Sequence, residues 1–169
     1  MPVVKIICEN NGAELSVNMG TALHEVINFL ALRNPQPFLA AYVNNRIKEL
    51  DYKIYKPVSI RFIDITHFEG ICVYQRTLFF IMHKAVHDLY PDATFSIRHS
   101  VSKGFYCEID NQDELSDKQI AQIKQRMDEI IAADIPIVRE RLFASEVENI
   151  YSKLGFDDKI ALLRTRPRL

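Results

Sequence analysis

The sequence is poor in glycine. Only five glycines occur among its 169 residues, and no two of them lie within five positions of each other. This spacing excludes the phosphate-binding loop GxxxxGK[ST], the dinucleotide-binding turn GxGxxG and the hydrolase motif GxSxG, because each of them needs two closely spaced glycines. Binding of a nucleotide through a glycine-rich loop is therefore not encoded in these residues.

Cysteine, net charge and long apolar runs are also scarce. The three cysteines, Cys8, Cys72 and Cys107, show no CxxC spacing and lie in apolar surroundings. They favour reduced, buried thiols in a cytoplasmic protein over disulfides or a cysteine-rich zinc site. With 21 basic and 22 acidic residues the formal net charge is −1, so we expect no strongly basic surface for nucleic acid or membranes. Apolar runs are short, and we expect no secretion signal and no membrane-spanning segment.

The first 65 residues show the pattern of a small α+β domain. Apolar residues alternate or cluster in short β-branched runs that are separated by turn residues, and a single helical pattern lies between them. One helix packed across a small mixed sheet buries such a pattern. We expect strands at residues 3–8, 13–17, 40–43, 46–50 and 58–65, with the helix following Thr21.

From residue 67 onward the pattern changes to longer helices, and we place a domain boundary near Thr66. No glycine- and serine-rich linker separates residues 1–66 from residues 67–169, so we expect the two domains to pack together or to share a rigid joint. The second domain is expected to be α+β as well and to be incomplete at its C-terminal end. Its predicted elements are a helix over 68–90, strands at 94–98 and 104–110, a helix opened by the capping box of Ser116 and Gln119, a strand at 137–142, and a short helix ending at Gly155.

The long helix carries an unusual mixture of residues away from its expected core. At 100° per residue, an apolar face forms from Ile71, Leu78, Ile81, Met82, Ala85 and Leu89. On the opposite side, Arg76, Phe80, His83 and His87 follow one another at successive turns. Two interpretations stay open, namely a partly solvated face with Phe80 covered by the strands that follow, or the wall of a ligand-binding groove.

Other arrangements were weighed as candidate sites. His83 and His87 have the i, i+4 spacing of a metal-binding pair, but neither a third ligand nor the glutamate of HExxH accompanies them, so we expect no metal site. Arg98, His99 and Lys103 form a polar turn between the two strands, which is either solvated or meets a phosphate or an acidic patch. No Ser/His/Asp or Cys/His arrangement is supported, and no catalytic residue is predicted.

Several stretches resemble known families. Residues 3–65 resemble a TGS domain through GTALHEVI (20–27), AAYVNNRIKEL (40–50) and VSIRFID (58–64). Residues 68–163 resemble the second N-terminal domain of threonyl-tRNA synthetase, which alanyl-tRNA synthetase shares, through HKAVHDLYPDATFSI (83–97), GFYCEID (104–110) and IKQRMDEIIAADIPIVRERL (123–142). The resemblance implies a ubiquitin-like β-grasp domain followed by an α+β editing-like domain.

In that family the second domain edits mischarged tRNA with an HxxxH pair on the long helix and a later Cys and His. The HxxxH positions fall on Arg76 and Phe80 here. Arginine stays charged and phenylalanine has no acid–base group, so neither replaces a histidine in proton transfer. His83 and His87 keep the spacing but lie seven residues later in the sequence. The resemblance therefore implies an editing-like fold without its catalytic pair.

A further resemblance is to bacterial proteins similar to uridine kinases, carried by residues 49–70 and by YQRTL at 74–78. It implies a non-catalytic accessory region of a nucleoside kinase, with the kinase domain downstream as its partner. ATP and Mg²⁺ would serve that missing domain, and these residues would hold no cofactor. We expect a small nucleotide or amino-acid-like ligand on the groove residues, weak RNA contact and no membrane.

Three functions thus stay open at this stage. The first is the accessory region of a uridine kinase-like enzyme. The second is a fragment of a tRNA-editing or threonyl-tRNA synthetase-related protein that binds or deacylates tRNA. The third is an interaction module without a pocket ligand, which presents a sheet edge or face to other macromolecules.

Overall fold

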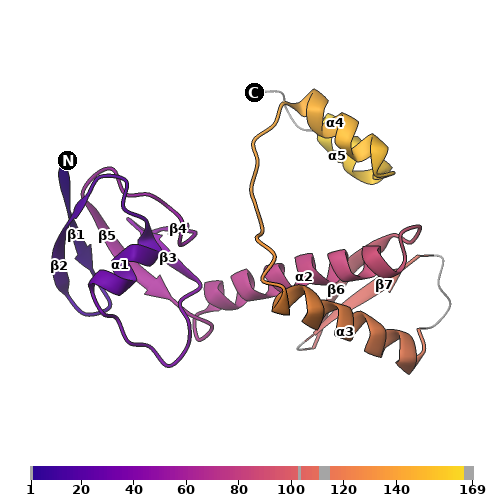
Figure 1. Ribbon diagram of the computed structural model, residues 1–169, viewed down its shortest axis with the longest axis horizontal. Helices are drawn as coiled ribbons and strands as arrows, with labels where there is room; N and C mark the ends of the chain where they lie inside the picture. Colours follow the sequence, from indigo (N-terminus) through magenta and orange to yellow (C-terminus); the bar gives the residue numbers. More distant parts are fainter. Residues whose placement is uncertain (1, 103, 111–114, 166–169) are drawn as a thin grey trace. The chain divides into compact units, whose positions relative to one another are not determined.

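The computed structural model describes residues 2–102, 104–110 and 115–165. The chain divides into two compact units, Met1–Ala133 and Asp134–Leu169. Strands gather in a five-stranded and a two-stranded sheet, and five helices are present in the described residues (Figure 1). The predicted α+β class is confirmed. The predicted boundary near Thr66 stays a prediction.

The first part of the chain forms the predicted β-grasp arrangement. Its strands follow the order β2-β1-β5-β3-β4, in which β1 and β5 run parallel and the other neighbours antiparallel. The single helix α1 lies between the two hairpins in sequence. The elements are β1 (Val3–Cys8), β2 (Ala13–Asn18), α1 (Leu23–Phe29), β3 (Ala40–Val43), β4 (Arg46–Lys48) and β5 (Val58–Ile63).

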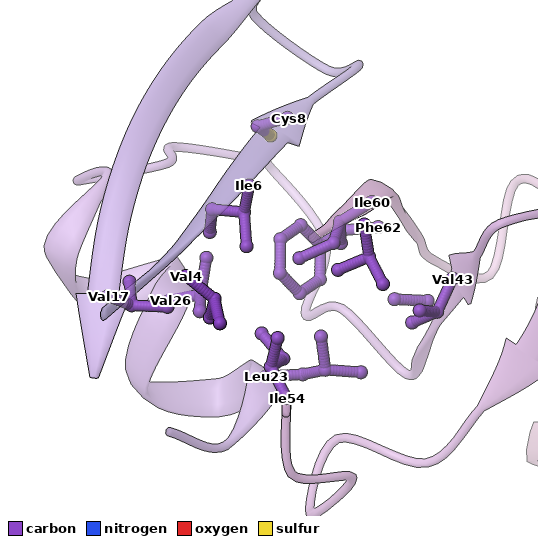
Figure 2. Packing of buried hydrophobic residues seen from close by; sticks show 12 residues of the cluster. Val4, Ile6, Cys8, Val17, Leu23, Val26, Val43, Ile54, Ile60 and Phe62 are labelled. Atoms are coloured by element: carbon purple, nitrogen blue, oxygen red, sulfur yellow. The ribbon is translucent and has the colours of Figure 1, made fainter. Parts of the chain in front are cut away.

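Buried residues of the strands and of α1 build the core of this sheet. In β1, every second residue is buried, so one face of the strand meets the helix and the other meets water. Phe62 of β5, Leu23 of α1 and Ile54 of the loop before β5 are fully buried. Figure 2 shows these side chains converging with those of β1 and β2 on a common interior. Burial of this apolar surface is the main stabilising contribution to the fold.

Asparagine residues are important in the turns of this sheet. Asn10 bonds the backbone of Phe62 twice, since its amide donates to the carbonyl oxygen at 3.0 Å and its Oδ1 accepts the N–H at 2.8 Å. Asn44 and Asn45 form the turn between β3 and β4 with positive φ angles of 46° and 63°, which asparagine tolerates better than most residues. The turn residues thus fix the register of the strands that they join.

The passage from β5 to the long helix α2 (Phe68–Leu89) is closely packed. The Asp64 carboxylate accepts hydrogen bonds from the hydroxyl and the N–H of Thr66, at 2.6 and 2.8 Å, and from the Asn34 amide. Its Oδ1 also lies 3.1 Å from Nδ1 of His67. The helix then passes so close to the strand end that a Cβ atom at Gly70 would lie 1.8 Å from the carbonyl oxygen of Asp64. Only glycine fits at this position.

A second hydrophobic cluster forms around α2. The hairpin of β6 (Phe95–Val101) and β7 (Gly104–Ile109) and the helix α3 (Asp117–Ala132) complete this layer, and α2 and α3 lie side by side along the hairpin (Figure 1). Its buried members are Ala85, Val86, Ile109, Ile123 and Ile130. Outside the cluster, Asp88 of α2 forms an ion pair with Arg126 of α3 at 2.8 Å and so links the two helices. Asp88 also pairs with Lys84 of its own helix.

The predicted capping box is present in this part, and one strand is longer than expected. The capping box at α3 forms as expected, since the Gln119 N–H donates to the Ser116 hydroxyl at 3.4 Å and the Gln119 side chain accepts the Ser116 N–H at 3.0 Å. The strand β6 reaches Val101, three residues beyond the expected end, because its pairing with β7 continues as far as Val101 and Gly104. None of the described helices combines the length and the apolar character that a membrane span needs.

The second unit differs from the prediction in two elements, since one expected strand is absent from residues 135–143 and the helix over Asp157–Thr165 has no counterpart in the prediction. The strand expected at 137–142 is wrong, since residues 135–143 form neither helix nor strand. Its apolar side chains remain exposed, with Val138 at 71% and Phe143 at 81%. β-Branched residues favour a strand only when another strand pairs with them. The unit continues with α4 (Ala144–Lys153), which ends as predicted before Gly155 at φ 71°, and with α5 (Asp157–Thr165).

We predict that Gly70→Ala destabilises the protein, although an alanine in a helix normally stabilises it relative to glycine. The added Cβ atom meets the backbone of Asp64, which cannot move without breaking the strand end, and such overpacking costs about 1–3 kcal/mol. Thermal and urea unfolding measure the effect. The matched control is Gly104→Ala, whose Cβ would lie 3.8 Å from its nearest neighbour. A Gly70→Ala variant as stable as the parent would contradict the close packing.

We predict that Asp64 makes stability fall in acid. Hydrogen bonds from Thr66, then Asn34, hold the pKa of its carboxyl well below the ordinary value of 3.8. The charged form therefore stabilises the fold at pH values above the ordinary pKa, and this contribution is lost as the pH falls through it toward the folded-state pKa. Asp64→Asn should lower the free energy of unfolding at pH 7 and flatten its decrease below about pH 4.

Denaturant unfolding between neutral pH and acid measures this effect. Asp51→Asn serves as the control, because that side chain is 92% exposed. The assignment is wrong if Asp64→Asn and Asp51→Asn show the same pH dependence.

Candidate functional site

The first two candidate residues of α2, Arg76 and Phe80, are exposed. Phe80 retains 62% of its accessible surface and Arg76, one turn earlier, is exposed as well. The neighbouring Phe79 instead packs edge-to-face on Phe105 of β7, with ring centroids 4.8 Å apart. The strands that follow α2 therefore cover Phe79, and the interpretation in which they cover Phe80 is wrong.

The two histidines lie further along α2 and are half-buried. The His83 ring stands 6.2 Å from that of Phe95 on β6, which places it toward the hairpin. His87 lies in the last turn of the helix. The four predicted residues of α2 thus follow one side of the helix, from the open positions of Arg76 and Phe80 toward the edge of the hairpin at His83.

The expected apolar face of α2 is only partly buried. Ala85 is fully buried and Ile81 and Met82 pack against the cluster, but Ile71 and Leu89 each retain 38% exposure. Val86, which lay outside the predicted set, has no exposed surface. The reason is that α2 packs on the hairpin and on α3 at once, so its buried arc is shifted from the one that hydrophobicity alone indicates.

The candidate residues of the hairpin lie in a different place. Arg98 binds Glu108 on the neighbouring strand with Nε and Oε2 2.5 Å apart, and this bond raises the pKa of the guanidinium. The His99 ring lies 5.3 Å from that of Tyr106. Lys103 lies outside the described residues.

The hairpin separates these two sets of candidates. Phe105 and Ile109 of β7 lie on the face of the hairpin that packs against α2. Because side chains alternate along a strand, Tyr106 and Glu108 lie on the other face. Arg98 and His99 bond or stack with residues on the face away from α2. The residues of α2 and those of the hairpin therefore do not form one groove. Sequence reasoning missed the partner Tyr106, which the register of the hairpin could have indicated.

The shifted acid–base groups do not gather on the candidate face of α2. Besides Asp64, the pKa of Glu69 is lowered because its carboxylate accepts a hydrogen bond from Tyr42, whose own pKa is raised. Glu69 lies in the first turn of α2 and Tyr42 lies on β3. Burial raises the pKa of the Cys107 thiol, which disfavours the nucleophilic thiolate.

The described residues contain no cluster of metal-ligating side chains. Across residues 2–102, 104–110 and 115–165, no three His, Cys, Asp or Glu side chains are arranged to hold a metal ion. The chemistry that the α2 face offers is therefore that of a permanent cation and an exposed aromatic ring, with two imidazoles beside them.

Comparison with known proteins gives one consistent group. The chain is 28% identical over 141 residues to the threonine–tRNA ligase of Rubrobacter xylanophilus, covering 83% of this chain and 22% of that protein. It is 27% identical over 165 residues to that of Desulforamulus reducens, covering 98% and 26%, and 26% identical over 157 residues to that of Syntrophomonas wolfei, covering 93% and 25%. This chain is similar to threonine–tRNA ligases. No protein-family model matches it.

These comparisons bear on the predicted resemblances in two ways. The expected likeness to threonyl-tRNA synthetase extends over nearly the whole chain. The relatives named above include no nucleoside kinase, so the expected uridine kinase parent has no support from them. The chain spans about a quarter of the length of these curated relatives.

We predict that the two adjacent phenylalanines of α2 differ in their contribution to stability. Phe79→Ala removes the edge-to-face contact with Phe105 and should lower the free energy of unfolding by about 2 kcal/mol. Phe80→Ala truncates a side chain that is 62% exposed and should cost less than about 0.5 kcal/mol. Parallel urea unfolding of both variants measures this. Equal losses, or a larger loss for Phe80→Ala, would show that α2 is rotated from the described position.

Proposed function

We propose that this chain is a tRNA-binding region related to the TGS and editing region of threonyl-tRNA synthetases, and that it binds tRNA without deacylating it. The similarity to threonine–tRNA ligases over 93–98% of the chain supports the relationship. The second part, that mischarged tRNA is not hydrolysed, rests on one observation. The exposed face of α2, defined by Arg76 and Phe80, carries no acid–base group.

The residues on that face suit binding better than proton transfer. At the positions where the resemblance places the editing histidines, α2 exposes Arg76 and Phe80. Arginine keeps its proton at every physiological pH, so it cannot act as a general base, but its planar guanidinium pairs well with a phosphate. An exposed phenyl ring stacks on a nucleobase or packs on a sugar. The face can therefore hold the phosphate and base of a nucleotide.

The remaining imidazoles do not restore the missing chemistry. His83 is half-buried against Phe95, and it lies about two turns from Arg76 along the helix. Without an acid–base pair at the open positions, an attacking water has no group there to take its proton. With a net charge of −1, binding rests on a few local contacts and not on a general attraction to RNA.

We predict that the chain binds threonine tRNA through α2 and does not hydrolyse the mischarged form. Arg76→Ala should weaken tRNA binding and reduce the dependence of log K on log salt by about one unit, as expected for one lost phosphate contact. Arg46→Ala on β4 is the matched control, since it removes an exposed arginine from the five-stranded sheet and leaves α2 unchanged. Filter binding at two salt concentrations and release of the amino acid from mischarged tRNA are the measurements.

The possible outcomes separate the two parts of this proposal. If tRNA does not bind, or if Arg46→Ala weakens binding as much as Arg76→Ala does, the binding site on α2 is wrong. Release of the amino acid faster than in buffer, at a rate that falls in His83→Ala or His87→Ala, would overturn the non-hydrolytic assignment and favour an active editing domain.

The accessory region of a nucleoside kinase is the second candidate. It is favoured by the stretches 49–70 and 74–78 and lacks support from the relatives. In this case the α2 face would take a small nucleotide or an amino-acid-like ligand, the partner would be a downstream kinase domain, and ATP and Mg²⁺ would belong to that domain. A GxxxxGK[ST] loop in the rest of the gene, with uridine phosphorylation by the full-length protein, would favour this candidate over the first.

A cytoplasmic location is part of both proposals. It is supported by the three cysteines, Cys8, Cys72 and Cys107, which are free thiols and at least partly buried. Free thiols persist in a reducing compartment.

A further inference from the structure

The face of the hairpin that points away from α2 carries residues with no role so far. We call it the outer hairpin face and define it by Arg98, His99 and Val101 of β6 and by Tyr106 and Glu108 of β7. His99 pairs with Tyr106 across the strands, and a register shift lies between Ile97 and His99. A bulge of this kind adds a residue to one strand and turns neighbouring side chains toward one face. Arg98 and His99 thereby both reach this face.

The two rings at its centre form an open aromatic surface. The ring centroids of His99 and Tyr106 lie 5.3 Å apart with an angle of 32° between their planes. Tyr106 retains 50% of its accessible surface and Val101, beside the turn, 52%. Aromatic rings on adjacent strands of an exposed sheet face are the arrangement on which RNA-binding domains stack unpaired bases.

The charges on this face indicate the kind of ligand. The guanidinium of Arg98 is held by the Glu108 carboxylate, so the cation is neutralised in place. An acidic peptide or a phosphate chain would have to compete with this carboxylate. A neutral nucleobase does not need to displace this carboxylate. Its edge offers hydrogen-bond donors to Glu108 and acceptors to Arg98, while its ring stacks on Tyr106.

We propose that the outer hairpin face is a stacking platform for unpaired bases of RNA. This inference rests on the proposed function in its choice of RNA as the ligand, but it concerns a surface separate from the α2 face. A base stacks on the Tyr106 ring with His99 beside it, and the Arg98–Glu108 pair borders the rings. Because the affinity arises from stacking and not from released counterions, it depends weakly on salt.

The test uses the chain of residues 1–169 and a fluorescein-labelled single-stranded RNA of about eight nucleotides. Fluorescence anisotropy is measured for the parent, Tyr106→Ala, Tyr106→Leu, Tyr106→Phe and His99→Ala, each checked for folding by circular dichroism. Tyr55→Ala is the matched control, because it removes another exposed tyrosine, at 58% exposure, from the loop before β5.

We expect Tyr106→Ala and Tyr106→Leu to weaken binding at least about fivefold, since base–aromatic stacking contributes about 1–3 kcal/mol per base. His99→Ala should weaken it in the same direction. Tyr106→Phe should bind like the parent, since it retains the ring, and Tyr55→Ala should leave binding unchanged. The slope of log K against log salt should be smaller than about one.

Several results would overturn the platform. They are equal affinity of the parent and Tyr106→Ala, full binding by Tyr106→Leu, loss of binding in Tyr106→Phe, or a steep salt dependence. If tRNA binding depends on Arg76 but Tyr106→Ala does not change the affinity for the oligonucleotide, the platform is wrong and the proposed function stands. Tyrosine-dependent binding of the oligonucleotide without binding of tRNA removes the proposed function and leaves the platform.

Discussion

The start of α2 depends on a contact that only glycine allows. At Gly70 the helix backbone passes against the carbonyl group of Asp64, at a distance that leaves no space for a Cβ atom. The Asp64 carboxylate holds the turn before the helix through Thr66 and Asn34. Strand β5 and helix α2 are therefore connected by a closely packed turn, and every candidate residue on α2 takes its place from the residue at which this helix begins.

The β6–β7 hairpin decides how the candidate residues are shared between surfaces. One of its faces is covered by α2 through Phe79, and the other carries Arg98, His99 and Tyr106. The candidate residues of α2 and those of the hairpin thus lie on two separate surfaces. Each surface has its own chemistry, with an exposed arginine and a phenyl ring on α2 and a stacked pair of rings beside a neutral ion pair on the hairpin.

The proposed binding without catalysis rests on the likeness to threonine–tRNA ligases and on the exposed side chains of α2. A fold can be retained while its reactive groups are replaced, because the core depends on apolar packing and the chemistry on a few exposed side chains. In this chain the core residues of α2, such as Ala85 and Val86, are fully buried. The open positions hold Arg76 and Phe80, neither of which transfers a proton.

The sequence by itself determined the mixed α+β class and most of the helices and strands up to residue 132. Strand alternation, turn asparagines and the Ser116 capping box are local signals, and each depends on residues near in the chain. Tertiary structure decided which of two adjacent phenylalanines is covered, which face Arg98 and His99 occupy, and that residues 137–142 form no strand. These outcomes depend on the partners that distant segments supply, because burial and strand pairing are properties of a contact and not of a residue.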